Sequence, residues 1–319
     1  MSLSSLVAAA GYRPDEPLVV GVARRDGPPV LLAQGTTAAG DPVTATTLVY
    51  AASLSKQLTA ACAALLVKDG VLDVDAPLSR WLPELPPWAS DVRLRHLVHH
   101  TAGLPDDRDI DAGHTTAGVL RALARFPSLP RRPGTAYAYS NAGYVCLAVA
   151  VERRAGRPLP AFARERLFAS LRMTRTLFWP GPSPVPDGPG SVAPVAGPAP
   201  LSLGDGGAWT TLTDLLRWGQ ALNTDEPGIA PLLQTPGRLD DGTPLDYAWG
   251  VGVREHAGHR VYRHGGGWPG LRALHARVPA PGLTLALIAL DDRTERRVTL
   301  MDGLLDAYLG SSSSSPIMR

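Results

Sequence analysis

Three short motifs in this 319-residue chain contain side chains suited to nucleophilic chemistry. The first is Ser53-Leu54-Ser55-Lys56, in which a lysine follows a serine at a spacing of three. If a helix begins here, the hydroxyl of Ser53 and the amine of Lys56 lie on one face and can meet. A serine hydroxyl is a weak nucleophile until a base takes its proton, and a desolvated lysine can act as that base. The alternative interpretation is a helix-capping Ser53 with a surface Lys56.

The lysine content of the chain singles out Lys56. Only two of the 31 basic residues are lysines, so the chain uses arginine for its ordinary surface charge. Arginine does not lose its proton in proteins, whereas lysine can. Lys68 precedes Gly70 at the predicted end of a helix, where a cation is ordinary. Lys56 stands where a group able to give up a proton is needed.

The second motif is Tyr139-Ser140-Asn141, which precedes an apolar run at Val145. A tyrosine beside a cation can carry a proton between a nucleophile and a leaving group. An asparagine offers a substrate amide one donor group and one acceptor. The alternative interpretation is a turn followed by a helix cap.

The third motif is the segment 264–268, His-Gly-Gly-Gly-Trp, which follows the strand-like residues 261–263. Glycines beside a strand let another backbone approach closely, so a substrate can pair with this edge. A glycine N–H can then complete an oxyanion hole. Trp268 is either an apolar wall of the acyl pocket or a packing aromatic, and the glycines are otherwise a hairpin turn. The chain has no G-x-x-x-x-G-K-[ST] phosphate loop.

Composition excludes several other classes of protein. Hydrophobic residues make up 45% and charged residues 19%, as in a folded globular chain. The net charge of +2 does not favour nucleic acid or an anionic membrane as the main partner. No apolar run reaches the roughly 18 residues of a membrane span. The N-terminal residues have no basic region before their short apolar part, so we expect no signal peptide and a cytoplasmic protein.

Cysteines and histidines indicate neither a disulfide nor a metal site. Cys62 and Cys146 lie in apolar helical patterns, which favours buried free thiols. His96, His99 and His100 have helical spacing, but no acidic or cysteine ligands accompany them. We therefore expect no metal and no cofactor.

The order of predicted elements favours an α+β fold. Strands gather near both ends of the chain and helices in its middle, which predicts an antiparallel β-sheet flanked by terminal helices, with an inserted mainly helical domain. The predicted sheet domain is 1–75 with 205–319. The helical domain is 76–204 and includes a Pro-rich loop, 180–200, and the tail 311–319 is predicted to be disordered. Predicted strands are 17–24, 30–34, 247–253, 261–263, 272–278 and 283–290, and predicted helices are 3–10, 53–70, 94–100, 117–126, 144–155, 212–222 and 297–309.

In this order the three motifs resemble those of the serine β-lactamase and penicillin-binding-protein superfamily. The chain looks most like the class C β-lactamase-like branch, which includes esterases, D-peptidases and transacylases. Other stretches are similar too: 99–105 to that branch's "SHTSGLP", 206–211 to its "GGLxST" and 247–253 to its "YGLGW". The resemblance covers nearly the whole chain and implies a β-lactamase/transpeptidase-like fold.

The resemblance also implies a role for each motif residue. Ser53 would be the acylated nucleophile and Lys56 its base or proton relay. Tyr139 would pass the proton to the leaving group and help to activate water for deacylation. How Lys56 and Tyr139 divide the base role stays open. Asn141 would contact the acyl side of the substrate.

Residues of the third motif complete this implied site. The N–H groups of Ser53 and Gly267 would form the oxyanion hole, and Gly266 and Trp268 would contact the substrate. His264 joins the catalytic set and stands where many β-lactamases and peptidases carry the lysine of Lys-Thr-Gly. An imidazole that is mostly neutral at pH 7 should bind a penicillin-type carboxylate less well.

The main hypothesis is a serine hydrolase that forms an acyl-enzyme on a small ester, amide or thioester. A second is an acyltransferase or peptide cyclase of the same fold, in which an amine resolves the acyl-enzyme. A third is a non-catalytic binding protein. The sequence does not indicate an oligomeric state.

Overall fold

The computed structural model describes residues 2–110, 113–181, 183, 185–186, 191–192 and 199–310. Most of the Pro-rich loop 180–200 and all of the tail 311–319 lie outside the described residues. The interpretations of these two segments therefore stay predictions.

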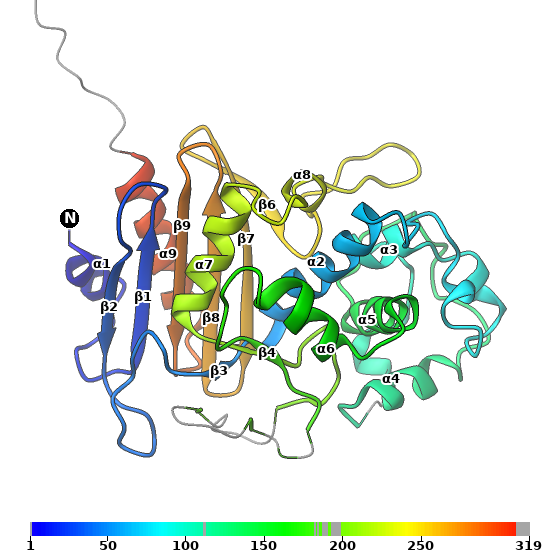
Figure 1. The fold of residues 1–319 in the computed structure, drawn as a ribbon, viewed down its shortest axis with the longest axis horizontal. Helices are drawn as coiled ribbons and strands as arrows, with labels where there is room; N and C mark the ends of the chain where they lie inside the picture. Colours follow the sequence, from blue (N-terminus) through cyan, green and yellow to red (C-terminus); the bar gives the residue numbers. More distant parts are fainter. Residues whose placement is uncertain are drawn as a thin grey trace, which may run out of the picture.

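A six-stranded antiparallel sheet, in the order β2-β1-β9-β8-β7-β6, forms the main layer (Figure 1). Strand β1 (Leu18–Ala23) pairs with β9 (Leu283–Ala289), so the two ends of the sequence share one sheet. This confirms the predicted α+β class. The other strands of the sheet are β2 (Val30–Gln34), β6 (Gly252–His256), β7 (His259–Trp268) and β8 (Leu271–Val278).

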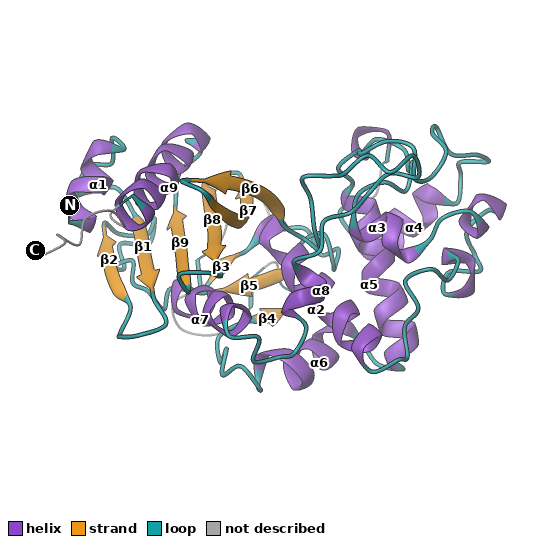
Figure 2. Cartoon of the chain, turned by 90° about the horizontal axis from the view of Figure 1, so that it is seen from above, coloured by secondary structure: helices purple, strands orange, loops and turns teal. Residues whose placement is uncertain are grey.

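Helices cover both faces of this sheet. Helix α7 (Leu212–Asn223) lies on one face, and α1 (Leu3–Ala9) and α9 (Thr294–Leu309) lie on the other (Figure 2). All seven residues of β9 are buried because this strand is covered on both sides. Its nearly continuous apolar run follows from that position.

A mainly helical region packs beside the sheet (Figure 2). At its centre, α2 (Ser55–Lys68) contacts α5 (Asn141–Ala155), and most residues of both helices are buried. Cys62 and Cys146 are buried free thiols, as predicted. The remaining α-helices are α3 (Leu94–Val98), α4 (Thr116–Leu123), α6 (Leu159–Ala163) and α8 (Ala230–Leu233). The proposed boundaries at 75/76 and 204/205 stay a prediction.

A second, small sheet was not predicted from the sequence. It has the order β3-β5-β4, with β3 (Val49–Tyr50), β5 (Ala208–Thr210) and β4 (Leu177–Phe178). Its strands are too short to show alternation. Since β3 ends three residues before Ser53, this sheet positions the turn that carries the predicted nucleophile.

Two predicted strand boundaries were wrong. Strand β7 continues through the glycines of the third motif, because these residues pair with β8. The predicted strand 247–253 begins only at Gly252, since Gly250 has a φ of +73° and interrupts the extended backbone. The third motif is therefore part of a strand and not a hairpin turn.

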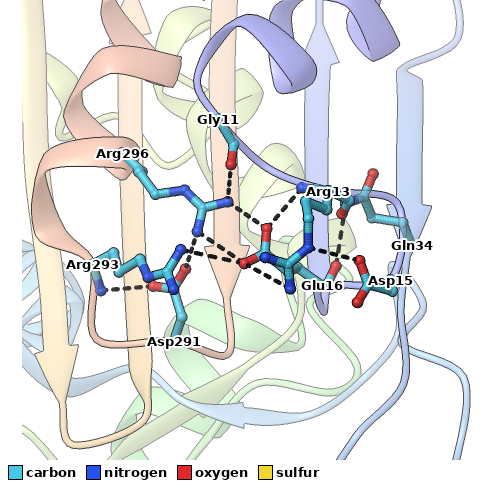
Figure 3. Close-up of polar contacts among 8 residues, drawn as sticks. All are labelled: Gly11, Arg13, Asp15, Glu16, Gln34, Asp291, Arg293 and Arg296. Atoms are coloured by element: carbon cyan, nitrogen blue, oxygen red, sulfur yellow. Dashed lines mark hydrogen bonds and ion pairs between the residues drawn. The ribbon is translucent and has the colours of Figure 1, made fainter.

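A cluster of ion pairs joins the N-terminal segment to the start of α9 (Figure 3). Glu16 accepts from both Nη atoms of Arg296, and Arg293 and Arg13 also face its carboxylate. These hydrogen bonds, above all those from Arg296, lower the pKa of Glu16 to about 2. We call Arg13, Glu16, Arg293 and Arg296 the terminal ion cluster.

No helix in the described part of the chain is both long enough and apolar enough to cross a membrane.

Candidate active site

Ser53 lies in a short 3-10 helix, η1 (Ala52–Leu54), directly before α2. Ala52 has a φ of +47°, which is strained for a residue with a side chain. The hydroxyl of Ser55 holds this turn by donating to the carbonyl of Ala52 at 2.7 Å and accepting from the N–H of Ala208 at 3.1 Å. The second serine of the motif is therefore structural, a role that the sequence analysis missed.

Lys56 lies in the first turn of α2 and is completely buried. Its Nζ atom is 3.3 Å from Ser53 Oγ, and it donates to Asn141 Oδ1 at 2.7 Å and to the carbonyl of Asp205 at 2.9 Å. These three acceptors match the three N–H donors of an ammonium, and all are uncharged groups. The alternative of a surface Lys56 is therefore wrong.

Tyr139 faces the same lysine. The Nζ atom of Lys56 lies 4.8 Å from the centre of the Tyr139 ring. The ring centre of Tyr139 is 6.1 Å from that of His264. Tyr139 as a residue is 40% exposed and lines a cavity, so it borders open space as well as the lysine. The structure thus brings together Ser53, Lys56, Tyr139 and His264 from two helical segments, a loop and a strand.

Asn141 is the first residue of α5 and follows the N-capping Ser140, as the helix-cap interpretation of the second motif predicted. The Asp107 carboxylate accepts from the backbone N–H of Asn141 at 2.9 Å and of Ala142 at 3.3 Å. This negative charge suits the positive end of α5. It also fixes the backbone of the residue that contacts Lys56.

Strand β7 presents the third motif to the nucleophile turn. Strand β6 pairs only with residues 259–263 of β7, so residues 264–268 have β8 on one side and, within the described part of the chain, no sheet partner on the other. The turn η1 contacts β7. A Cβ added to Gly266 would lie 2.3 Å from the carbonyl oxygen of Ala51, so only glycine permits this approach. Gly267 is the next residue of this strand, and its role in an oxyanion hole with Ser53 stays a prediction.

His264 is neutral in this setting. Burial, together with the nearby charge of Lys56, lowers its pKa to about 4. Its Nδ1 atom lies 2.7 Å from the carbonyl oxygen of Gly265. Because a carbonyl only accepts, Nδ1 carries the proton and Nε2 is left as an acceptor.

Two cavities flank the cluster of site residues. The first, of about 580 Å³, is lined by Tyr139 and His264. The second, of about 430 Å³, is lined by Asn141, Asp205 and Trp268. Substrate groups on the two sides of a reacting carbonyl would therefore meet different surroundings.

Asp107 and Asp205 were not among the site residues predicted from the sequence. Asp205 directly precedes the segment 206–211, and burial raises the pKa of its carboxyl group. The signal for Asp205 was its place beside a recognised stretch, whereas Asp107 gave no local signal. Among the described residues, no group of three or more His, Cys, Asp or Glu side chains is arranged to hold a metal ion.

Known proteins share both sequence and fold with this chain. The family profile described as Beta-lactamase matches residues 7–308. Penicillin-binding protein 4* of Bacillus subtilis is 29% identical over 272 residues, which is 74% of this chain and 59% of the relative. A D-aminopeptidase of Brucella canis is 30% identical over 253 residues, 74% of this chain and 48% of the relative. The chain therefore spans only about half to three-fifths of the length of these relatives.

Solved structures support the same fold. D-amino acid amidase of Ochrobactrum anthropi SV3 superposes with a TM-score of 0.80 at 22% identity, covering 96% of this chain and 100% of the other. The octameric penicillin-binding-protein homologue of Pyrococcus abyssi gives 0.81 at 19% identity, covering 97% and 77%. At these identities the likeness establishes the architecture alone.

Proposed function

Since this chain belongs to the β-lactamase family of serine hydrolases, we propose that it cleaves a small amide or ester through an acyl-enzyme on Ser53. The observation that carries the proposal is the contact between Lys56 Nζ and Ser53 Oγ at 3.3 Å. Lys56 is completely buried, and its remaining contacts are uncharged acceptors. A lysine in such a place is suited to exchange a proton with the serine hydroxyl.

The proposed acylation begins when Ser53 Oγ attacks the substrate carbonyl and its proton passes to the coupled pair Lys56 and Tyr139. The N–H groups of Ser53 and Gly267 would stabilise the resulting oxyanion. Collapse of this intermediate breaks the bond to the leaving group, which takes the proton from Tyr139. In deacylation, water attacks the acyl carbon of the Ser53 ester and gives a proton to the same pair. The bond between that carbon and Ser53 Oγ then breaks, Oγ takes the proton back from the pair, and the acid leaves.

Amides are the favoured substrates. The sequence relatives include a D-aminopeptidase, and a structural neighbour is a D-amino acid amidase. The neutral His264 does not supply the permanent charge that a lysine would give at this position. A substrate selected by hydrogen bonds to Asn141 and to the open edge of β7 fits these surroundings.

A peptide whose leaving residue ends in a carboxylate is a more specific candidate. Arg254, Arg263 and Arg297 line the same cavity as Tyr139 and His264. Arg254 and Arg263 pair with aspartates, whereas the hydrogen bonds of Arg297 run from Nη1 to two backbone carbonyls. The guanidinium group of Arg297 would supply the positive charge that His264 lacks.

Mass spectrometry of the intact protein tests the acyl-enzyme. After incubation with a fluorophosphonate and with panels of esters, thioesters, amides and β-lactams, we expect adducts on Ser53 that are absent in Ser53→Ala. The exposed Ser170 provides a matched control, because Ser170→Ala should leave labelling unchanged. Folded protein that shows no adduct at Ser53 would contradict the proposal and favour a binding protein.

Product analysis separates hydrolysis from acyl transfer. With water as the acceptor, the product is the free acid whether or not an amine is added. An acyltransferase or cyclase would instead give an amide that increases with amine concentration. A cytoplasmic location also stays a prediction, which fractionation of the source cells tests.

A further inference from the structure

One buried histidine contacts the segment that carries Tyr139. His100 follows α3, is only 2% exposed and has a φ of +57°. A residue with a side chain seldom occupies this left-handed region, because the conformation costs energy. Its surroundings must therefore hold His100 in place.

Both residues next to Tyr139 donate a hydrogen bond to His100. The N–H of Ala138 donates to the carbonyl of His100 at 2.8 Å. The N–H of Ser140 donates to His100 Nδ1 at 3.1 Å. The backbone is thus held immediately before and immediately after Tyr139 by a single residue 39 positions earlier in the chain.

The ring of His100 also packs against the ring of Tyr139. The two ring centres are 4.4 Å apart, with an angle of 37° between the ring planes. On its other sides, His100 contacts Tyr144 at 5.0 Å and Tyr247 at 4.8 Å between ring centres. These aromatic contacts restrict the orientation of the Tyr139 side chain as well as its backbone.

The hydrogen bonds require a neutral His100. Because Nδ1 accepts from Ser140, the ring proton resides on Nε2, which is buried without a hydrogen-bond partner in the described residues. Burial, and then the nearby charge of Lys56, lower the pKa of His100 well below its usual range. A neutral ring beside Lys56 adds no competing charge to the site.

We propose that His100 is a positioning residue for Tyr139. It fixes the backbone on both sides of Tyr139 and the plane of its ring, so that the phenol stays beside Lys56 and His264. This inference depends on the proposed role of Tyr139 as the proton carrier. A misplacement of about 1 Å can cost roughly a hundredfold in rate, so such positioning has a measurable effect.

The chain offers a matched control in His96. This histidine is 6% exposed, and its Nδ1 accepts a backbone N–H, that of Arg93, at 3.1 Å. It therefore makes the same kind of buried hydrogen bond without touching Tyr139. The variant His96→Leu therefore measures how much kcat changes when a buried imidazole away from Tyr139 is lost.

The test compares His100→Leu with His100→Asn, in the wild-type and Tyr139→Phe backgrounds. Leucine and asparagine have similar shapes, but only asparagine offers an acceptor near the position of Nδ1 and tolerates a left-handed backbone. With a fluorogenic ester, His100→Leu should lower kcat by about 10- to 100-fold with little change in KM. His100→Asn should restore most of that loss, and His96→Leu should leave kcat within about threefold of wild type.

The double variants decide whether His100 acts through Tyr139. Once Tyr139 is phenylalanine, His100→Leu should change the remaining rate by less than about threefold. An equal loss in both backgrounds, a kcat for His100→Leu equal to wild type, or no recovery with asparagine would overturn the proposal. If His100→Leu does not fold, His100→Gln replaces it, because its amide lies one bond farther from the backbone than that of asparagine.

Failure of the underlying function has a different signature. Turnover that survives Ser53→Ala would contradict the acyl-enzyme itself. Turnover that depends on Ser53 and Tyr139 but is unaffected by His100→Leu would contradict only the positioning role.

Discussion

Lys56 and Arg296 are both cations held by several hydrogen bonds, but the charges of their partners differ. Arg296 donates to both carboxylate oxygens of Glu16 in the terminal ion cluster (Figure 3). Lys56 contacts a hydroxyl, an amide oxygen and a backbone carbonyl. Removing a proton from Lys56 therefore breaks no ion pair, whereas Arg296 and Glu16 keep each other charged. The first arrangement permits proton transfer, and the second joins two segments of chain.

Replacing Lys56 with a residue that keeps its charge should lower activity the most. Lys56→Arg replaces a cation that can lose its proton with one that cannot, and it also brings a larger group into a buried site. We expect kcat/KM to fall by about 10²- to 10⁴-fold. Lys68→Arg is the matched control, since Lys68 donates to the carbonyl of Pro227 at a distant helix end. Ester turnover within tenfold of wild type in folded Lys56→Arg would argue against a proton-transfer role.

Removing the hydroxyl of Tyr139, the second proposed proton carrier, should lower activity somewhat less. Tyr139→Phe keeps the ring above Lys56 but deletes the hydroxyl, so we expect kcat to fall by about 10²-fold or more. Tyr137 is similarly exposed and lines the same cavity, so Tyr137→Phe controls for loss of a phenol there. Steady-state kinetics on one ester would measure both variants. Equal losses in the two would indicate substrate binding and not proton transfer.

Breaking the terminal ion cluster should change stability and not activity. Glu16→Gln removes the charge that Arg296 and Arg293 share, and we expect the free energy of unfolding to fall by about 1–3 kcal/mol. Urea unfolding followed by tryptophan fluorescence would measure this change. The kcat of the variant should equal that of wild type. A fall in kcat without loss of stability would mean that this cluster communicates with the active site.

Acid should weaken the fold gradually. Burial lowers the pKa of five histidines, His100 among them, below the ordinary 6.5, so the unfolded chain takes up their protons first. Their contribution to stability is complete above about pH 6.5 and decreases toward about pH 4. The pKa is about 4 for His96, His99 and His264 and about 3 for His275.

Asp205 and Asp214 should instead stabilise the fold as the pH falls. Burial raises the pKa of each carboxyl group, so the folded chain binds these protons more readily than the unfolded chain. We expect the histidines to dominate. Urea midpoints measured between pH 7 and pH 4 would then fall with acidity. Midpoints that rise over this range would show that the buried carboxyl groups outweigh the imidazoles.

Local spacing explains which parts of the site the sequence could predict. Ser53 and Lys56 lie one helical turn apart, so their contact follows from the motif. Asn141 and Asp205 reach Lys56 from 85 and 149 residues away, and such contacts depend on how helices and loops pack. The role of Asn141 was inferred from a resemblance. Asp205 was not predicted, because the group that contacts Lys56 is its backbone carbonyl, which every residue has.

The same reasoning applies to the fold. A run rich in β-branched residues predicted β1 closely and an almost wholly apolar run predicted β9, because burial on both faces selects apolar residues. The glycines of β7 gave no strand pattern. Gly266 is required by the close approach of Ala51, which lies more than 200 residues away in the sequence. The second sheet could not be predicted from the sequence, because β3 and β4 have two residues each and such short strands show no alternation.

The pairing of β1 with β9 has a consequence for how this protein is made. Leu18 pairs with Ala289, so β1 has no partner on that side until the residues of β9 have left the ribosome. Contacts between such distant residues slow folding and leave strand edges exposed to other chains. Helices α2 and α5 can meet long before then. Synthesis would therefore first produce a packed helical region that carries Ser53 and Lys56. Strands β7, β8 and β9 would then complete the active site around these residues.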